Sequence, residues 1–223
     1  MLGLYIGIIL LLNIPYVQHR MSVLVAKELS TVLGSELTVG RINIGLLNRI
    51  IIDDLVLNDQ LGKELLKIGR LSAKFEILPL FSGKISIGNV QLFSFNANLE
   101  RPTPQASTNF QFVLDAFASK DTVKKKSNLD LRINSLLIRR GKVSYDVLSA
   151  ESTPGKFNPQ HIRLSNILAN VSLKALQNDS VNAAIKRMSV EEEHSGFELK
   201  KLSLKIIAND RKMRIENFAI DLP

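Results

Sequence analysis

Residues 50–57 read Ile50-Ile-Ile-Asp-Asp-Leu-Val-Leu57, and this stretch predicts the fold. Its apolar residues stand at positions i, i+2, i+5 and i+7, around the polar pair Asp53-Asp54. A helix turns by about 100° per residue, so these positions would scatter around its surface. In a strand, alternate residues share a face, and one extra residue in the middle restores the phase as a bulge or bend. The stretch therefore predicts a kinked strand with one apolar face.

The same spacing recurs along the chain. The copies are Ile50, Ile52, Leu55 and Leu57; Leu66, Ile68, Leu71 and Ala73; Ile85, Ile87, Val90 and Leu92; Leu131, Ile133, Leu136 and Ile138; Ile162, Leu164, Ile167 and Ala169; Ala183, Ile185, Met188 and Val190; Phe197, Leu199, Leu202 and Leu204; and Met213, Ile215, Phe218 and Ile220. The pairs between them are Asp53-Asp54, Gly69-Arg70, Gly88-Asn89, Asn134-Ser135, Ser165-Asn166, Lys186-Arg187, Lys200-Lys201 and Glu216-Asn217. We expect these pairs to be hinges that curl a long sheet with one apolar face.

Composition limits the class of protein. The chain has 223 residues, of which 45% are hydrophobic, so it can bury a core and is not mainly disordered. It has no cysteine, which excludes disulfides and thiolate metal sites. The formal net charge of +8 comes from Lys and Arg spread over the polar sides of the strands. We therefore expect no nucleic-acid partner and favour attraction to anionic lipid headgroups.

The amino-terminal residues 1–19 form an apolar segment near the lower length limit of a spanning helix. We expect an uncleaved transmembrane anchor, because a cleaved signal peptide would need a charged start and a small-residue cleavage site. The anchor residues are Leu2, Leu4, Ile6, Ile8, Ile9, Leu10, Leu11 and Leu12. Residues 20–34 then predict an amphipathic helix that ends at Gly34 and either covers the first strands or lies on a membrane surface.

Beyond this helix the chain predicts two β blocks. The first spans residues 35–100, with strands at 37–44, 50–58, 64–78, 85–92 and 94–100 and a tight connection at 79–84. Residues 101–128 form a loop with a short helix at about 109–119 and a basic linker at 121–128. Residues 129–223 form the second block, broken by a loop at 149–161, and we expect it to continue in a longer parent chain. The predicted fold class is mainly β: a curled, antiparallel-type groove.

Residues with catalytic potential are scattered. His19, His161 and His194 have no partner at metal-ligand spacing, and we expect each to be solvated. Asp53-Asp54 belongs to a repeat, so we interpret it as structural. No nucleophile elbow, P-loop or dinucleotide fingerprint occurs. We expect no enzymatic activity, no cofactor and no metal.

Several stretches carry a resemblance to a known family. They are the runs Leu29-Ser-Thr-Val-Leu-Gly-Ser-Glu-Leu-Thr-Val-Gly-Arg-Ile-Asn-Ile-Gly45, Ile50-Ile-Ile-Asp-Asp-Leu-Val-Leu-Asn58, Ile77-Leu-Pro-Leu80, Gly83-Lys-Ile-Ser-Ile-Gly-Asn-Val-Gln-Leu92 and Asn109-Phe-Gln-Phe-Val-Leu-Asp115. Together they resemble the amino-terminal region of the AsmA-like superfamily, and within it the TamB family, the inner-membrane subunits of the translocation and assembly module.

The resemblance implies one amino-terminal helix in the inner membrane of a Gram-negative bacterium and a taco-shaped, apolar β-groove in the periplasm. It implies transport of phospholipid between membranes, assembly of outer-membrane proteins, or both, with an outer-membrane barrel partner of the TamA or BamA type. Members of the family are usually far longer. The region thought to meet the barrel has no counterpart in this sequence.

The predicted site is therefore an apolar row that takes phospholipid acyl chains. Its residues are Ile50, Ile52, Leu55, Leu57, Leu66, Ile68, Leu71, Ile85, Ile87, Val90, Leu92, Leu131, Ile133, Leu136, Ile138, Ile162, Leu164, Ile167, Ile185, Met188, Leu199, Leu202, Leu204, Ile215, Phe218 and Ile220. Two alternatives remain open. The groove could receive nascent outer-membrane strands by edge pairing, or two sheets could close into a β-sandwich that binds no ligand.

Overall fold

The chain folds into one long sheet accompanied by helices α2 (Pro15–Leu33) and α4 (Gln111–Phe117). The computed structural model describes residues 3, 7, 10–45, 48–75, 85–117, 129, 130, 134–153, 155–177, 180–209 and 212–223. The strands are β1 (Leu37–Gly45), β2 (Arg49–Asn58), β3 (Glu64–Phe75), β4 (Ile85–Arg101), β5 (Leu129–Asp130), β6 (Ser135–Val147), β7 (His161–Gln177), β8 (Ser180–Glu192), β9 (Phe197–Asn209) and β10 (Met213–Asp221).

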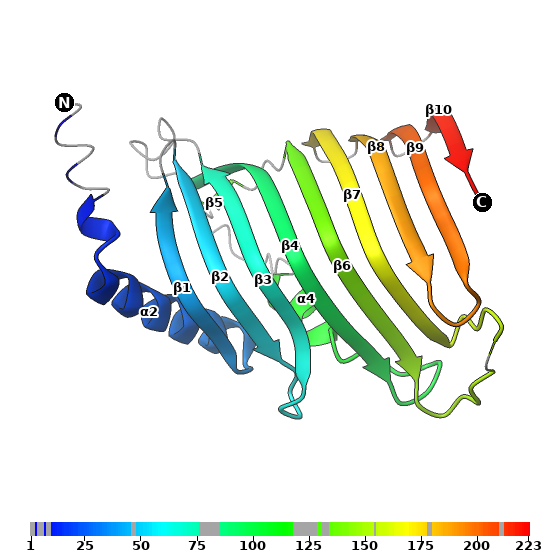
Figure 1. The fold of residues 1–223 in the computed structure, drawn as a ribbon, viewed down its shortest axis with the longest axis horizontal. Helices are drawn as coiled ribbons and strands as arrows, with labels where there is room; N and C mark the ends of the chain where they lie inside the picture. Colours follow the sequence, from blue (N-terminus) through cyan, green and yellow to red (C-terminus); the bar gives the residue numbers. More distant parts are fainter. Residues whose placement is uncertain are drawn as a thin grey trace.

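The strands lie in the order β1-β2-β3-β4-β6-β7-β8-β9-β10, and β5 pairs with β4. Figure 1 shows them side by side, with α2 along the β1 edge and β10 at the other edge. A mainly β, curled and unclosed sheet is thus confirmed. Neighbours are antiparallel except at β4, which pairs in parallel with β5 and β6. The prediction of an antiparallel sheet is wrong there, because a parallel pair requires a crossover, and the connection that contains α4 provides it.

Helix α2 begins earlier than predicted. Pro15 occupies its first turn, where a missing N–H costs nothing, so the helix starts before residue 20. It ends as predicted at Gly34, whose φ of 64° is left-handed and whose N–H donates to the Ser30 carbonyl. Of the predicted anchor residues, Leu2, Leu4, Ile6, Ile8 and Ile9 lie outside the described residues. Within the described part of the chain, no helix combines the length and apolarity needed to cross a membrane.

The central connection is partly as predicted. Helix α4 lies within the predicted range 109–119. Strand β4 is continuous, although the sequence predicted separate strands at 85–92 and 94–100. The chain bends at Ser94, whose φ is 53°, without leaving the sheet. The predicted connection at 79–84 and the linker at 121–128 lie outside the described residues.

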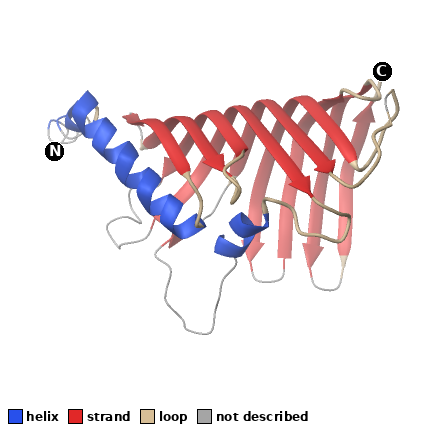
Figure 2. Ribbon diagram, turned by 90° about the horizontal axis from the view of Figure 1, so that it is seen from below, coloured by secondary structure: helices blue, strands red, loops and turns tan. Residues whose placement is uncertain are grey.

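The sheet is folded along a line that crosses its strands, which we call the crease (Figure 2). Left-handed residues mark this line within the strands: Asp54, Ser94, Arg140, Asn166 and Asn217, with φ between 50° and 55°. Such a residue turns the strand sharply, so each strand crosses from one wall of the fold to the other. The bends at these positions therefore come from a left-handed backbone conformation.

Glycines let neighbouring strands bend together. Asp53 pairs with Arg70 and Leu55 with Ile68, which places Asp54 opposite Gly69. A β-carbon at Gly69 would lie 3.3 Å from Cβ of Ser94, and one at Gly40 would lie 3.0 Å from Cβ of Asp54. Both distances are tighter than ordinary packing, so side chains at these glycines would push the strands apart at the crease.

Most of the predicted hinge pairs lie on the crease. Asp53-Asp54, Ser165-Asn166 and Glu216-Asn217 contain left-handed residues. Register shifts show bulges at Lys186-Arg187, between Ile185 and Met188, and at Lys200-Lys201, between Leu199 and Leu202. The predictions at Gly88-Asn89 and Asn134-Ser135 are wrong, because β4 and β6 bend at Ser94 and Arg140. In both strands the repeat begins five residues later than predicted, at Val90 instead of Ile85 and at Leu136 instead of Leu131.

Candidate functional site: the trough

Cross-strand pairing joins the apolar repeat positions into a continuous row. The row runs Ile42, Ile52, Leu71, Leu92, Ile138, Ala169, Met188, Leu202 and Ile220, each residue being the register partner of the next. On the other side of the crease, Val39 pairs with Leu55 and Leu55 with Ile68. The concave side of the sheet, which we call the trough, therefore has an apolar wall on each side of its floor.

When the copies in β4 and β6 are taken to begin at Val90 and Leu136, every strand of this row carries the repeat. Strand β1, which is not among the predicted copies, has Leu37, Val39, Ile42 and Ile44. Strand β4 carries Val90, Leu92, Phe95 and Ala97, and β6 carries Leu136, Ile138, Gly141 and Val143. In β6 the glycine at position 141 interrupts the apolar pattern, and in β4 the spacing fits both from Ile85 and from Val90, so the sequence alone does not distinguish the two. The predicted lining residues Leu131 and Ile133 lie outside the described residues, as do the side chains of Ile85 and Ile87.

Helices cover the trough over β1–β4. Leu55, Leu57 and Ile68 are buried in a cluster with Leu33 of α2 and Leu65 of β3, and parts of α4 pack on it. These predicted lining residues are therefore a packed core, and no ligand can reach them in this structure. Leu65, at 0% exposed, was missed because it stands outside the repeat spacing; the register shift beside Asn58 turns it inward.

No described helix covers the trough over β6–β10. The apolar cluster on which α2 and α4 pack contains residues of β1–β4, and none of its described members belongs to β6–β10. Ile167 and Leu199 are buried near the floor, whereas Leu136, Met188 and Leu204 are only half-buried. On the edge strand β10, Ile215, Phe218 and Ile220 are at least half exposed. An apolar wall that remains accessible to ligand thus exists at the β6–β10 end.

The convex side of the crease is polar. Asp53 accepts hydrogen bonds from Nε of Arg70 at 2.6 Å and from Nη2 at 3.3 Å. Asp54 projects beside them, and hollows here are lined by Arg41, Arg70 and Arg140. The interpretation of Asp53-Asp54 as structural agrees with this arrangement, since one carboxylate is engaged in an ion pair and the other residue forms the bend.

One histidine prediction is wrong. His161, expected to be solvated, has a side chain that is 14% exposed; its Nδ1 lies 2.8 Å from Oδ1 of Asp146 and its Nε2 lies 3.0 Å from the Ala150 carbonyl. Both partners are acceptors, so both ring nitrogens carry protons when both bonds form. The bond to Asp146, assisted by the Ala150 carbonyl, raises the pKa of His161. This residue joins β6, β7 and the loop between them.

The described residues contain no group of three or more His, Cys, Asp or Glu that could hold a metal ion. Unlike the residues at the convex crease, the polar clusters around His161 and Glu192 lie at strand ends and turns. Glu192, which is buried, accepts hydrogen bonds from the backbone N–H groups of His194 and Ser195 and from the Ser195 hydroxyl. These contacts fix the turn between β8 and β9. The trough, by contrast, has an apolar lining that continues from strand to strand.

Comparisons with known proteins give no assignment. No protein-family model matches the sequence, and no curated protein matches it either. The chain is therefore characterised by its own geometry: a single folded sheet whose concave side is closed by helices over β1–β4 and open over β6–β10.

Proposed function

We propose that the open part of the trough binds the acyl chains of phospholipid. The observation that carries this proposal is the apolar wall of β6–β10, none of whose described residues belongs to the cluster that α2 and α4 cover. Aliphatic surface of this kind gains free energy when it leaves water, and each buried CH₂ of a ligand contributes about 0.8 kcal/mol. Because the contacts are apolar and repeated, such a surface holds a chain without fixing its position.

The cellular role in this proposal follows from the resemblance to the AsmA-like superfamily. The chain is then a periplasmic protein that is anchored in the inner membrane through residues 1–19. It would transport phospholipid between membranes, assist outer-membrane protein assembly, or do both, together with a barrel of the TamA or BamA type. The excess of basic residues is compatible with anionic headgroups at either membrane surface.

The closed β-sandwich is not supported, because the described strands form one sheet whose edges, β1 and β10, do not pair. A second candidate function rests on β10. This edge strand has one neighbour, β9, and exposes Met213, Ile215, Phe218 and Ile220. Long apolar edges tend to acquire another strand, so β10 offers a place where an extended polypeptide, either a continuation of this chain or a separate one, could add to the sheet.

Lipid extraction from the purified full chain tests the first function. We expect phospholipid to co-purify with the wild type and to be lost from Leu136→Asp, which places a charge on the open wall. The matched control is Leu24→Asp, on the exposed outer face of α2, which should keep the lipid. If the folded Leu136→Asp protein retained as much lipid as the control, acyl-chain binding in the trough would be wrong.

Photo-crosslinking separates the two functions. A crosslinker at Leu204, on the half-buried wall of β9, should capture lipid if the trough binds acyl chains. A crosslinker at Phe218, on β10, should capture polypeptide if the edge receives strands. A crosslinker at Leu57, which is 3% exposed in the helix-covered core, should capture neither.

A further inference from the structure

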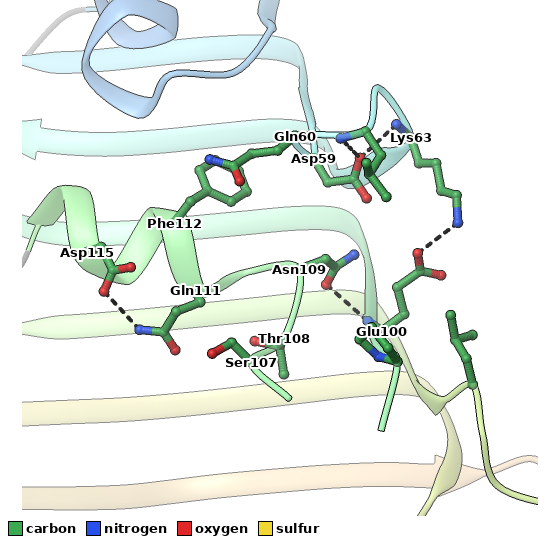
Figure 3. A pocket seen from close by; sticks show the side chains of 13 residues that line it. Asp59, Gln60, Lys63, Glu100, Ser107, Thr108, Asn109, Gln111, Phe112 and Asp115 are labelled. Atoms are coloured by element: carbon green, nitrogen blue, oxygen red, sulfur yellow. Dashed lines mark hydrogen bonds and ion pairs between the residues drawn. The ribbon is translucent and has the colours of Figure 1, made fainter. Parts of the chain in front are cut away.

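A pocket of about 510 Å³ lies outside the trough, where the turn between β2 and β3 meets the end of β4 and the segment that leads into α4. Figure 3 shows this pocket. Its lining includes Asp59, Leu61, Glu100, Phe112 and Asp115. The sequence does not predict this pocket, because its residues come from segments far apart in the chain and none belongs to a repeat.

Asp59 is the unusual residue of this pocket. It is only 3% exposed, and its Oδ1 accepts hydrogen bonds from the backbone N–H groups of Leu61 and Lys63, both at 2.9 Å. Its Oδ2 is buried and has no hydrogen-bond partner among the described residues. In Figure 3 the carboxylate points from the turn toward the space between Phe112 and Glu100. A buried carboxylate oxygen without a donor is rare in native proteins and calls for an explanation.

The charge of the pocket is opposite to that of the chain. Asp59, Glu100 and Asp115 are acidic, and among the lining residues that the structure describes Lys63 alone is basic. Lys63 is engaged, since its Nζ lies 2.8 Å from Oε1 of Glu100. The lining therefore carries an excess of negative charge in a chain whose formal net charge is +8. Such a site repels anions and attracts a cation.

Apolar groups form the rest of the wall. Leu61, Phe112 and Leu148 line the pocket beside the carboxylates. A bare ion would gain nothing from these groups, and the described residues offer no metal-binding cluster. A ligand that combines a cationic hydrogen-bond donor with a short hydrocarbon part matches both halves of the lining.

We propose that this pocket binds a primary ammonium group on a short apolar stem. The ammonium donates to Oδ2 of Asp59, Asp115 adds attraction from the open side, and the stem contacts Leu61 and Phe112. The ligand has two possible sources: a free alkylamine, or the ethanolamine headgroup of a phospholipid. The second source rests on the proposed lipid-binding function, and the first does not.

Calorimetric titration of the full chain with n-hexylamine tests the proposal. We expect wild type to bind hexylamine, and to bind neither hexanol nor hexanoate, which share the stem but lack the ammonium. Asp59→Asn should weaken hexylamine binding at least tenfold, because it removes the charge while its side-chain oxygen can still accept the turn's hydrogen bonds. Glu151→Gln, an exposed acid outside the pocket, is the matched control and should bind as the wild type does.

Asp115→Asn keeps the test decisive if Asp59→Asn fails to fold, because Asp115 is exposed; it should weaken hexylamine binding severalfold. Equal binding of hexylamine by wild type and both variants, or equal binding of hexanol and hexylamine, would overturn the proposal.

Binding to phospholipid vesicles identifies the source of the ammonium group. If wild type prefers phosphatidylethanolamine over phosphatidylcholine and Asp59→Asn does not, the ligand is the headgroup; hexylamine binding without this preference assigns a free amine. Asp59 and Asp115 lie outside the trough, so a loss of hexylamine binding in their variants and the failure of acyl-chain binding are distinguishable.

Discussion

The ring of Phe95 on β4 occupies the space that a side chain at position 141 of β6, a glycine, would otherwise take. A β-carbon at Gly141 would lie 2.8 Å from Cζ of Phe95 and closer still to the neighbouring ring carbon. Gly141 stands at an apolar position of the repeat, next to the left-handed Arg140. The aromatic ring thus supplies the apolar surface that the β6 copy lacks, and it does so where the parallel pair of strands crosses the crease.

Replacing Gly141 with alanine should therefore destabilise the protein. The added methyl group overlaps the Phe95 ring, which must shift within a packed region, and overpacking of this kind costs about 1–3 kcal/mol. Urea denaturation measures the change. Gly88→Ala is the matched control, since its added carbon would have nothing closer than 3.6 Å and should change stability little. The double variant Phe95→Leu with Gly141→Ala should recover part of the loss; no recovery would mean that the ring is not the cause.

Arg140→Gly should leave stability unchanged or raise it by up to about 1 kcal/mol. Arg140 adopts a φ of 55°, which is unfavourable for an L side chain and free of penalty for glycine. Lys142→Gly makes a comparable exchange at an exposed position of the same strand without a positive φ, and it should lower stability by about 0.5–1 kcal/mol. Chemical denaturation compares the two, and equal losses would show that the left-handed backbone at the crease carries no strain.

The contrast between these positions shows what the sequence could predict. The spacing around Asp53-Asp54 predicted a kinked strand, and the left-handed φ of Asp54 accounts for it. In β6 the same spacing was assigned five residues too early, because Gly141 has no side chain and its apolar surface is supplied by Phe95. A residue pattern within one strand cannot reveal a side chain that is supplied by its neighbour. For the same reason the pattern placed Leu55 and Leu57 in an open groove: their coverage by α2 and α4 depends on where these helices dock.

The sequence could not predict the pocket at Asp59 for a similar reason. Asp59 and Gly62 indicate a turn, but the orphaned oxygen and the opposing Glu100 and Phe112 become neighbours only when β2, β4 and α4 meet. Local spacing predicts how a strand bends and which face is apolar. It does not predict which distant loop closes over a turn.

The pairing of His161 with Asp146 should make stability depend on pH near neutrality. The hydrogen bond to Asp146 raises the pKa of His161 above 6.5 in the folded state, although Arg163 opposes the shift. A raised folded-state pKa means that the stabilisation is fully present below pH 6.5 and is lost as the pH rises through the raised value. Proton NMR of the ring should show the raised pKa, and Asp146→Asn should return it toward 6.5.

Denaturation at several pH values supplies the second readout. The stability difference between wild type and His161→Gln should be largest below pH 6.5 and shrink at higher pH. His19→Gln, on the exposed side of α2, should leave the pH dependence as it is in the wild type. A difference that grew with pH would contradict a protonated His161 between its two acceptors.

The ionisation of Glu192 should control the stability of the fold at low pH. Burial opposes its ionisation, but hydrogen bonds from the hydroxyl and N–H of Ser195 and from the N–H groups of His194 and Arg163 outweigh burial and lower the pKa of Glu192 to about 2. A lowered folded-state pKa gives stabilisation that is present above pH 4.5 and is lost as the pH falls toward 2. Glu192→Gln keeps the shape of the side chain but removes the charge that these donors face, so it should lower stability at pH 7 by about 1–3 kcal/mol.

Glu193→Gln, an exposed neighbour in the same turn, should change stability little. Because Glu192→Gln has already lost the charge, its stability should fall less than that of the wild type between pH 4.5 and 2. Parallel acid losses in the two proteins would instead locate the sensitive carboxylate elsewhere in the sheet.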